Sequence, residues 1–148
     1  GLFVFGNYYD LVLPGSGKLQ KEKILRALAL GPSPSQLRST RLTSLPSRAI
    51  KPRSFIIAIT PLLGIDPSFL FVLKGSRHQV VAISPDEISR ILDENKLDQT
   101  ERMALRIARL ERQLQIEKLS RSGIPVLDWQ TDTPFEPVIN RFLNRLRP

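Results

Sequence analysis

The sequence predicts an α/β protein in which a doubly wound, mostly parallel sheet is preceded by an antiparallel hairpin. Three short apolar runs, at residues 54–60, 79–84 and 124–129, have the length and the β-branched content of buried strands. A helical pattern follows each run after a short connection. Strands that alternate with helices in this way pair in parallel through right-handed crossovers.

A hairpin and one helix are predicted before these three units. The run "GLFVFG" at the start of the sequence is typical of a strand, and "LVL" follows the turn "NYYD" as its antiparallel partner. Residues 18–30 alternate apolar and basic positions at helical spacing, which predicts an amphipathic helix. Residues 31–53 are rich in Ser, Pro and Arg and are expected to form a divergent basic loop.

Capping signals predict where the later helices begin. Asp66 is followed by a proline, and residues 84–87 and 133–136 have the Ser/Thr-x-x-Glu pattern of a capping box. The longest helix is expected over residues 99–122, where apolar residues recur at helical spacing. Its Glu, Arg and Lys residues, Arg112 among them, are predicted to pair at i,i+4 on a solvated face.

Composition bounds the class of protein. A chain of 148 residues, 41% hydrophobic and 24% charged, fits a single globular domain. Because the chain contains no cysteine, disulfide scaffolds, thiolate metal sites and cysteine nucleophiles are excluded. A net charge of +8 favours an anionic partner, although charged surfaces also serve only to keep a domain soluble. No apolar stretch is long enough to span a bilayer and no signal peptide is visible, so we expect a cytoplasmic location.

One short stretch is similar to a phosphate-binding loop. Residues 15–18, Gly-Ser-Gly-Lys, lie between an apolar run and a helix, where the loop pattern G-x-x-x-x-G-K-[ST] occurs in nucleotide-binding proteins. The first glycine of that pattern is replaced by Val12, and the hydroxyl residue that should hold magnesium is replaced by Leu19. We therefore interpret the stretch as a tight turn that leads into a helix.

The single histidine, His78, precedes a predicted strand and so lies at the opposite end of the sheet from the usual ligand site. It is expected to be a solvated loop residue rather than a catalytic base.

Residues at the carboxyl ends of the predicted strands are the first candidate site. Open parallel sheets bind ligands at this edge, and here it carries Thr60, Ser84, Asp128 and Trp129. Two hydroxyls, one carboxylate and one indole are a small chemical repertoire, and no pair of carboxylates has a spacing that implies acid–base work. These four residues are therefore predicted to bind a partner or ligand, and no catalytic residue is predicted.

The second candidate site is a basic patch in the divergent loop, which we expect to contact an anionic partner. Its members are Arg38, Arg41, Arg48, Lys51 and Arg53. Aromatic residues for base stacking do not alternate with these cations, so nucleic acid is not the favoured partner.

Several segments, in order, resemble one family. "GLFVFGNYYDLVLPGSGK", "PRSFIIAITPLL" and "RIARLERQLQIEKLSRSGIPVLDW" are similar to successive segments of domain-of-unknown-function family 58. Its members carry a von Willebrand factor A-like domain and are often found alongside MoxR-type AAA+ ATPases. The resemblance implies that residues 1–148 are the C-terminal part of one truncated A-like domain whose central first strand is missing. An unpaired apolar edge would then remain beside the strand at residues 54–60.

The resemblance also bears on metal binding. The family holds a divalent metal through an Asp-x-Ser-x-Ser loop, a threonine from a second loop and an aspartate from a third. The first loop would lie upstream of Gly1, the third-loop aspartate falls on Pro61, and Thr60 matches only the hydroxyl position before it. We therefore expect this chain to bind no metal or other cofactor. A divalent metal such as Mg²⁺ is expected only if the parent protein carries the upstream loop.

The resulting functional prediction is a non-catalytic protein-interaction module, an adaptor or assembly factor for a MoxR-type AAA+ ATPase. Its basic loop would face an acidic partner or an anionic membrane surface. Because relatives often carry membrane helices, the parent protein is expected to reach the membrane through a segment outside this sequence. Two alternatives stay open: a nucleotide- or phosphate-binding hydrolase built on the doubly wound sheet, and a basic nucleic-acid-binding module.

Overall fold

The computed structural model describes residues 1–4, 10–30, 50–64, 66–92 and 97–146. The chain divides into two compact units, Gly1–Lys51 and Pro52–Pro148.

The first unit contains a hairpin and a helix. Strands β1 (Leu2–Val4) and β2 (Asp10–Val12) pair antiparallel, as the sequence predicts. Helix α1 (Gly17–Leu30) begins at a glycine with φ of +79°, a left-handed conformation that favours glycine. The amide of Gln20 donates a hydrogen bond of 2.8 Å to the carbonyl of Leu13 and so ties the first turn of α1 to the chain that leads into it.

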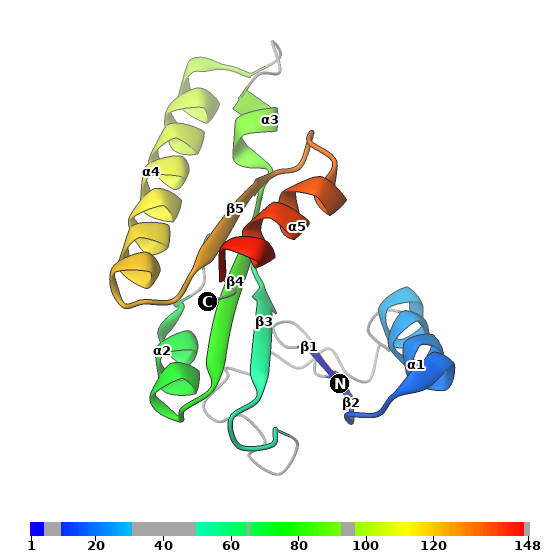
Figure 1. The fold of residues 1–148 in the computed structure, drawn as a ribbon. Coiled ribbons are helices and arrows are strands. Elements are labelled where there is room, and N and C mark those ends of the chain that lie inside the picture. Colours follow the sequence, from blue (N-terminus) through cyan, green and yellow to red (C-terminus); the bar gives the residue numbers. More distant parts are fainter. Residues whose placement is uncertain (5–9, 31–49, 65, 93–96, 147–148) are drawn as a thin grey trace. The chain divides into compact units, whose positions relative to one another are not determined.

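The second unit is built on a parallel sheet of three strands (Figure 1). Its strands are β3 (Phe55–Ile59), β4 (Gln79–Asp86) and β5 (Val126–Gln130), in the order β3-β4-β5. Both pairs are parallel, and Ser84 of β4 lies opposite Asp128 of β5. The α/β fold with an N-terminal antiparallel hairpin and a parallel sheet is therefore confirmed.

Within the described part of the second unit, four helices alternate with these strands and lie on both faces of the sheet. They are α2 (Ser68–Gly75), α3 (Ile88–Leu92), α4 (Gln99–Arg121) and α5 (Phe135–Leu146). Arg112 of α4 contacts Asp128 on one face, whereas Phe135 of α5 contacts Trp129. Because consecutive strand residues point to opposite faces, α4 and α5 cover different faces of β5.

The core of the second unit surrounds the middle strand. Residues 80–83 of β4 are buried on both faces, as is typical of a parallel strand that is covered on both sides. Leu70 of α2, Leu119 of α4 and Ile124 before β5 are fully inaccessible to solvent. These side chains pack α2 and α4 against the sheet and so help to position its carboxyl edge.

Strand β3 differs from its prediction. The apolar run at residues 54–60 predicts a buried strand, but Phe55, Ile57 and Ile59 are 53%, 45% and 69% exposed. The prediction of a buried strand is wrong because β3 lies at the end of the described sheet, and no described helix of its unit covers this face of the strand.

The capping box predicted at residues 84–87 is also wrong. Ser84 lies inside β4, which continues to Asp86, and Asp86 performs the capping role instead. Its Oδ1 accepts hydrogen bonds from the backbone N–H of Ile88 at 3.1 Å and of Ser89 at 3.3 Å. Tertiary pairing of β4 with β5 extends the strand by two residues and moves the start of the helix accordingly.

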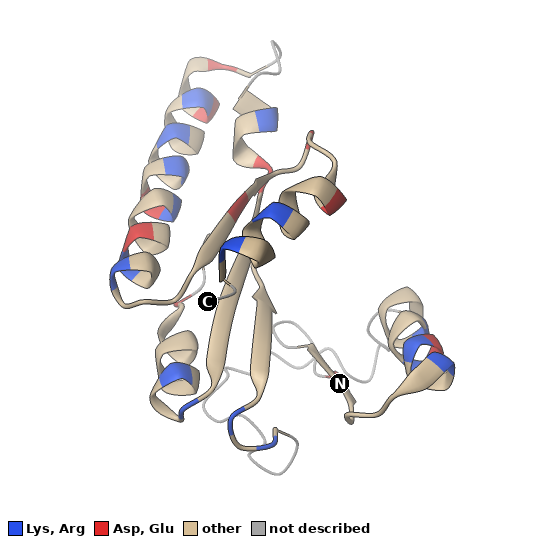
Figure 2. Ribbon diagram, in the orientation of Figure 1, with Lys and Arg blue, Asp and Glu red and all other residues tan. Residues whose placement is uncertain are grey.

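Helix α4 ends one residue before the predicted bound of 122, and its buried face differs from the prediction. Arg112, Ile116 and Leu119 face the sheet, so the placement of Arg112 on a solvated face is wrong. Charges of both signs still alternate along the rest of the helix (Figure 2), and Arg121 pairs with Glu117 at 3.3 Å. None of the helices in the described ranges has the length and apolar character needed to cross a bilayer.

Candidate functional site

Two of the four predicted edge residues lie side by side, joined by a cation that the site prediction did not include. Ser84 and Asp128 are register partners at the carboxyl ends of β4 and β5. The Nη2 atom of Arg112 donates to the Oδ1 of Asp128 at 2.6 Å and to both the carbonyl and the hydroxyl oxygen of Ser84 at 3.0 Å. One guanidinium nitrogen thus links α4 to two strands.

The hydroxyl of Ser84 extends this network to the turn after β3. It donates to the carbonyl of Pro61 at 3.2 Å while its oxygen accepts from Arg112. A serine hydroxyl has one proton to donate, and that proton is committed to Pro61. Ser84 is fully buried, so in this arrangement the hydroxyl fastens three segments together rather than facing a solvent-borne substrate.

Asp86 provides a second carboxylate to Arg112, whose Nη1 lies 3.9 Å from its Oδ2. Burial pushes the pKa of Asp86 upward, but hydrogen bonds from the hydroxyl and amide of Ser89 and the charge of Arg112 outweigh it. The pKa of Asp86 is therefore lower than its ordinary value, and the group stays ionised at neutral pH. A carboxylate held in this state is a poor general acid.

Thr60 follows β3 in a tight, buried turn. Its side chain is 4% exposed, and its Oγ1 lies 3.4 Å from the backbone nitrogen of Leu62, which donates to it. Leu62 has a φ of +56°, the left-handed region that non-glycine residues seldom occupy. Because Leu62 is itself 2% exposed, burial of its side chain compensates for the unfavourable backbone.

Trp129 belongs to the opposite face of β5. Its indole Nε1 donates to the carbonyl of Thr133 at 3.0 Å, and its ring meets that of Phe135 edge-on, with centroids 4.8 Å apart. These contacts fix the start of α5. The structure thus brings together Ser84, Asp128 and, through Pro61, Thr60, but places Trp129 on the other side of the sheet.

Arg112 is the residue that sequence reasoning assigned to the wrong environment. A signal was present: Leu105, Arg112, Ile116 and Leu119 share one helical face, at successive intervals of seven, four and three residues. A buried arginine within an apolar stripe needs hydrogen-bond acceptors, and the partly exposed carboxylate of Asp128 and the buried Ser84 supply them. The pattern of charges along the helix does not by itself distinguish the buried arginine from the exposed ones.

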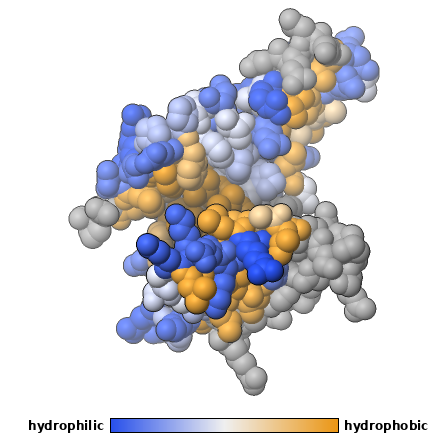
Figure 3. Space-filling model, turned by 90° about the vertical axis from the view of Figure 1, so that its right-hand side faces the viewer, coloured by the Kyte–Doolittle hydropathy of each residue, from blue (hydrophilic) through white to orange (hydrophobic). Residues whose placement is uncertain are grey.

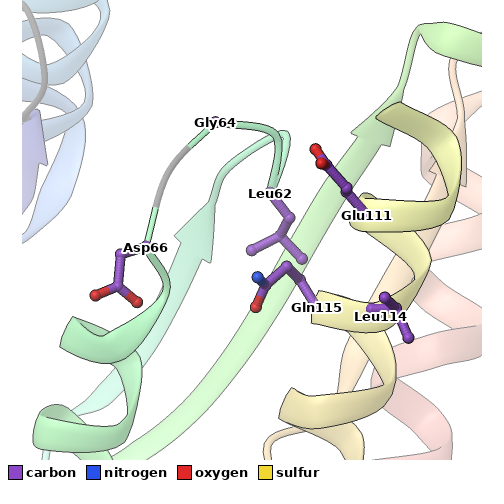
Figure 4. A pocket seen from close by; sticks show the side chains of 6 residues that line it. All are labelled: Leu62, Gly64, Asp66, Glu111, Leu114 and Gln115. Carbon is purple, nitrogen blue, oxygen red and sulfur yellow. The ribbon is translucent and has the colours of Figure 1, made fainter. Parts of the chain in front are cut away.

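A shallow groove of ≈ 470 Å³ lies beside this network, between the turn after β3 and α4 (Figure 4). Leu62 and Gly64 line it on one side, and Glu111, Leu114 and Gln115 line it on the other. The Oε1 atom of Gln115 is buried and has no hydrogen-bond partner within the described part of the chain. Asp66 also lines the groove, and hydrogen bonds from the side chain and then the backbone of Ser68 lower its pKa.

The remaining predicted residues lie elsewhere. His78 Nδ1 accepts a hydrogen bond of 3.2 Å from the backbone of Ser54, at the amino ends of β3 and β4. Of residues 15–18, Gly15 and Ser16 border a second groove, of ≈ 550 Å³, at the start of α1. Of the basic patch, Lys51 and Arg53 are exposed. Arg38, Arg41 and Arg48 lie outside the described residues.

Among the residues that the structure describes, no group of three or more His, Cys, Asp or Glu side chains is arranged to hold a metal ion. The fold and this network define an α/β protein whose sheet edge is closed by an arginine-centred polar cluster. Comparison with models of protein families, with curated protein sequences and with solved structures finds no match to this chain. The resemblance to family 58 accordingly enters below as a proposal.

Proposed function

We propose that this chain is a non-catalytic protein-interaction module and acts as an adaptor or assembly factor. The observation that carries the proposal is the apolar face of β3, which no described helix of its own unit covers and where Phe55, Ile57 and Ile59 are about half or more exposed. Contiguous apolar surface of this kind marks interaction sites more often than isolated exposed residues do. On the side of the molecule that Figure 3 shows, exposed hydrophobic side chains lie beside hydrophilic ones.

The open edge of β3 adds backbone groups to this apolar face. The carbonyl of Ser54 and the N–H of Thr60 bond to β4, so even-numbered residues direct their backbone groups toward that neighbour. In a parallel ladder the alternate residues direct theirs the other way, which leaves the N–H and C=O groups of Phe55, Ile57 and Ile59 at the outer edge of the described sheet. Such an edge can accept an added strand from a partner.

The polar cluster at the carboxyl edge supports a structural rather than a chemical role for that edge. Arg112 engages Asp128, and the hydroxyl proton of Ser84 is directed at Pro61. A nucleophile would need a free hydroxyl beside a base, and here the nearest cation and carboxylate satisfy each other. This arrangement argues against the hydrolase alternative.

The proposed partner is a MoxR-type AAA+ ATPase, on the strength of the resemblance to family 58. The net charge of +8 and the basic patch suit an acidic surface on that partner, and an anionic membrane surface is the second target of the same patch.

Binding to a purified MoxR-type ATPase, measured by biolayer interferometry, tests the proposal. Ile59→Lys places a charge on the open face of β3, and Val72→Lys does the same on α2, where the exposure is a comparable 65%. We expect Ile59→Lys to weaken binding by about tenfold or more and Val72→Lys to leave it within about twofold. Equal effects of the two substitutions, or no binding by the unmodified chain, would refute the proposal.

Thermal-shift measurements distinguish the alternatives. A rise of several degrees in Tm with ATP or GTP and Mg²⁺ would favour the hydrolase, because a ligand that binds only the folded state stabilises it. Binding to DNA or RNA that falls steeply with salt would favour the nucleic-acid module.

A further inference from the structure

We propose that the outward face of α4 is a homodimer interface, in which two copies of the chain pair their α4 helices in parallel. The face consists of Met103, Ile107, Leu110 and Leu114, called the outer stripe below. These side chains are 53%, 51%, 66% and 65% exposed, although apolar residues at helical spacing ordinarily face a core.

The outer stripe lies on the side of α4 away from the sheet. Successive residues of an α-helix are rotated by about 100°, so the four members stand between about 140° and 180° from Arg112 around the helix axis. Arg112 is buried against β4 and β5. The helix therefore has two apolar stripes, one that anchors it to its own sheet and one that is open.

The spacing within the outer stripe is that of a coiled coil. The intervals are four, three and four residues, which is the d-a-d-a order of a heptad repeat with Ile107 at an a position and Leu110 at the following d position. A β-branched residue at a and leucine at d favour two helices over three or four. The occupant that fits the stripe is thus one further helix.

Charges beside the stripe identify that helix as a second copy in parallel orientation. With Ile107 at position a, Arg106 is at g and Glu111 is at the e position of the next heptad. In a parallel pair each g residue faces the e residue of the next heptad on its partner, so Arg106 of each copy meets Glu111 of the other. An antiparallel pair centred on the stripe places Arg106 near Gln113 and Glu111 near Ala104, without any attraction of charges.

Both charged residues are available for this contact. Arg106 and Glu111 are exposed, and neither has an ion-pair partner among the residues that the structure describes. By contrast, Glu117 and Arg121 would occupy the next d and a positions and pair with each other along the helix at 3.3 Å. The seam therefore ends at Leu114 and comprises four layers.

An interface of four layers is small, so we expect a reversible dimer. Because α4 is already folded on its sheet, pairing does not require the ordering of a free helix, which lowers the cost of association. Sedimentation equilibrium of the full chain over roughly 1–500 µM covers the affinity expected of an interface at the small end of the known range.

Two substitutions with matched exposure test the location of the interface. Leu110→Glu puts a charge in the centre of the seam, and Val72→Glu puts one on α2 at nearly the same exposure. Leu110→Glu should raise the dimer dissociation constant by at least about tenfold, and Val72→Glu should leave it within about twofold. Circular dichroism of both variants checks that the fold is retained. A chain that is monomeric throughout the range would overturn the proposal.

Charge reversal tests the parallel orientation. Arg106→Glu and Glu111→Arg each create like charges across the seam and should each weaken the dimer by roughly three- to tenfold. The double variant restores opposite charges at both contacts and should return to within about twofold of the unmodified chain. If the double variant does not restore the affinity of the dimer, the parallel pairing of Arg106 with Glu111 is refuted.

A lipid-facing amphipathic helix is the competing explanation of the same stripe. It predicts that the monomer sediments with vesicles of phosphatidylcholine and phosphatidylserine and that Leu110→Glu abolishes this binding. It also predicts that Arg106→Glu weakens and Glu111→Arg strengthens binding, since anionic lipid responds to net charge. If the chain does not dimerise and the variants change vesicle binding in this way, the outer stripe binds lipid and the dimer proposal is wrong.

Discussion

Substitution of Arg112 by methionine tests whether the polar cluster holds the carboxyl edge of the sheet together. Methionine keeps much of the apolar stem and removes the guanidinium, so the change isolates the hydrogen bonds and the charge. The bonds at stake are those from Nη2 to Asp128 at 2.6 Å and to the two oxygens of Ser84 at 3.0 Å. Asp86, 3.9 Å away, loses its nearby cation as well.

The magnitude follows from how much of the cluster remains out of water. Loss of one partner from a fully buried ion pair costs about 3–5 kcal/mol of the free energy of unfolding. The side chain of Asp128 is 43% exposed and regains water, which reduces the cost, whereas the buried oxygens of Ser84 lose the guanidinium donor. We therefore expect Arg112→Met to destabilise the protein by about 2–3 kcal/mol, or roughly 5–10 °C in Tm.

Urea unfolding followed by the fluorescence of Trp129, the single tryptophan of the chain, measures this change close to the cluster. Asp128→Asn, which keeps an acceptor oxygen, should cost about 1 kcal/mol on its own and less than half of that in the Arg112→Met background. Additive effects of the two substitutions, or a cost below about 1 kcal/mol for Arg112→Met, would refute the interpretation of Arg112 as the link between α4 and the two strands.

Two further predictions concern the helix starts. The pKa of Asp86 is lowered in the folded state, so its contribution to stability is present above its unfolded pKa of about 3.9 and is lost as the pH falls through the lower folded value. Asp86→Asn should therefore flatten the acid limb of a plot of unfolding free energy against pH, and an unchanged limb would contradict the assignment. Asp98 accepts from Glu101 N at 2.7 Å while Glu101 Oε2 accepts from Asp98 N at 2.9 Å. Asp98→Ala should thus cost about 1 kcal/mol in thermal or urea unfolding, with Asp98→Ser recovering most of it.

Much of the second unit was predictable because its local signals agree. The apolar runs at residues 54–60, 79–84 and 124–129 each form a strand, and helix α4 has nearly the predicted bounds. Asp66 precedes α2 as expected, and its Oδ1 accepts from Ser68 N at 3.0 Å. These features depend on a few neighbouring residues, so periodicity and capping patterns are sufficient to find them.

The candidate site was only half predictable. The rule that ligand sites lie at the carboxyl ends of parallel strands correctly selects Ser84 and Asp128 as neighbours, since the register pairs them. It also selects Trp129, because the rule does not say which face of the sheet a residue occupies. The rule does not select Arg112, because a residue on a helix reaches the strand ends only through tertiary packing.

The sequence by itself determined the kinds of elements, their order and the parallel pairing, because apolar periodicity and crossover handedness act over short stretches of chain. Only the tertiary structure decided which side of each element meets the core. Strand β3 has the composition of a buried strand yet leaves alternate side chains exposed, and α4 buries an arginine while it exposes Leu110. Burial is a property of what packs against a residue, and distant parts of the chain supply that packing.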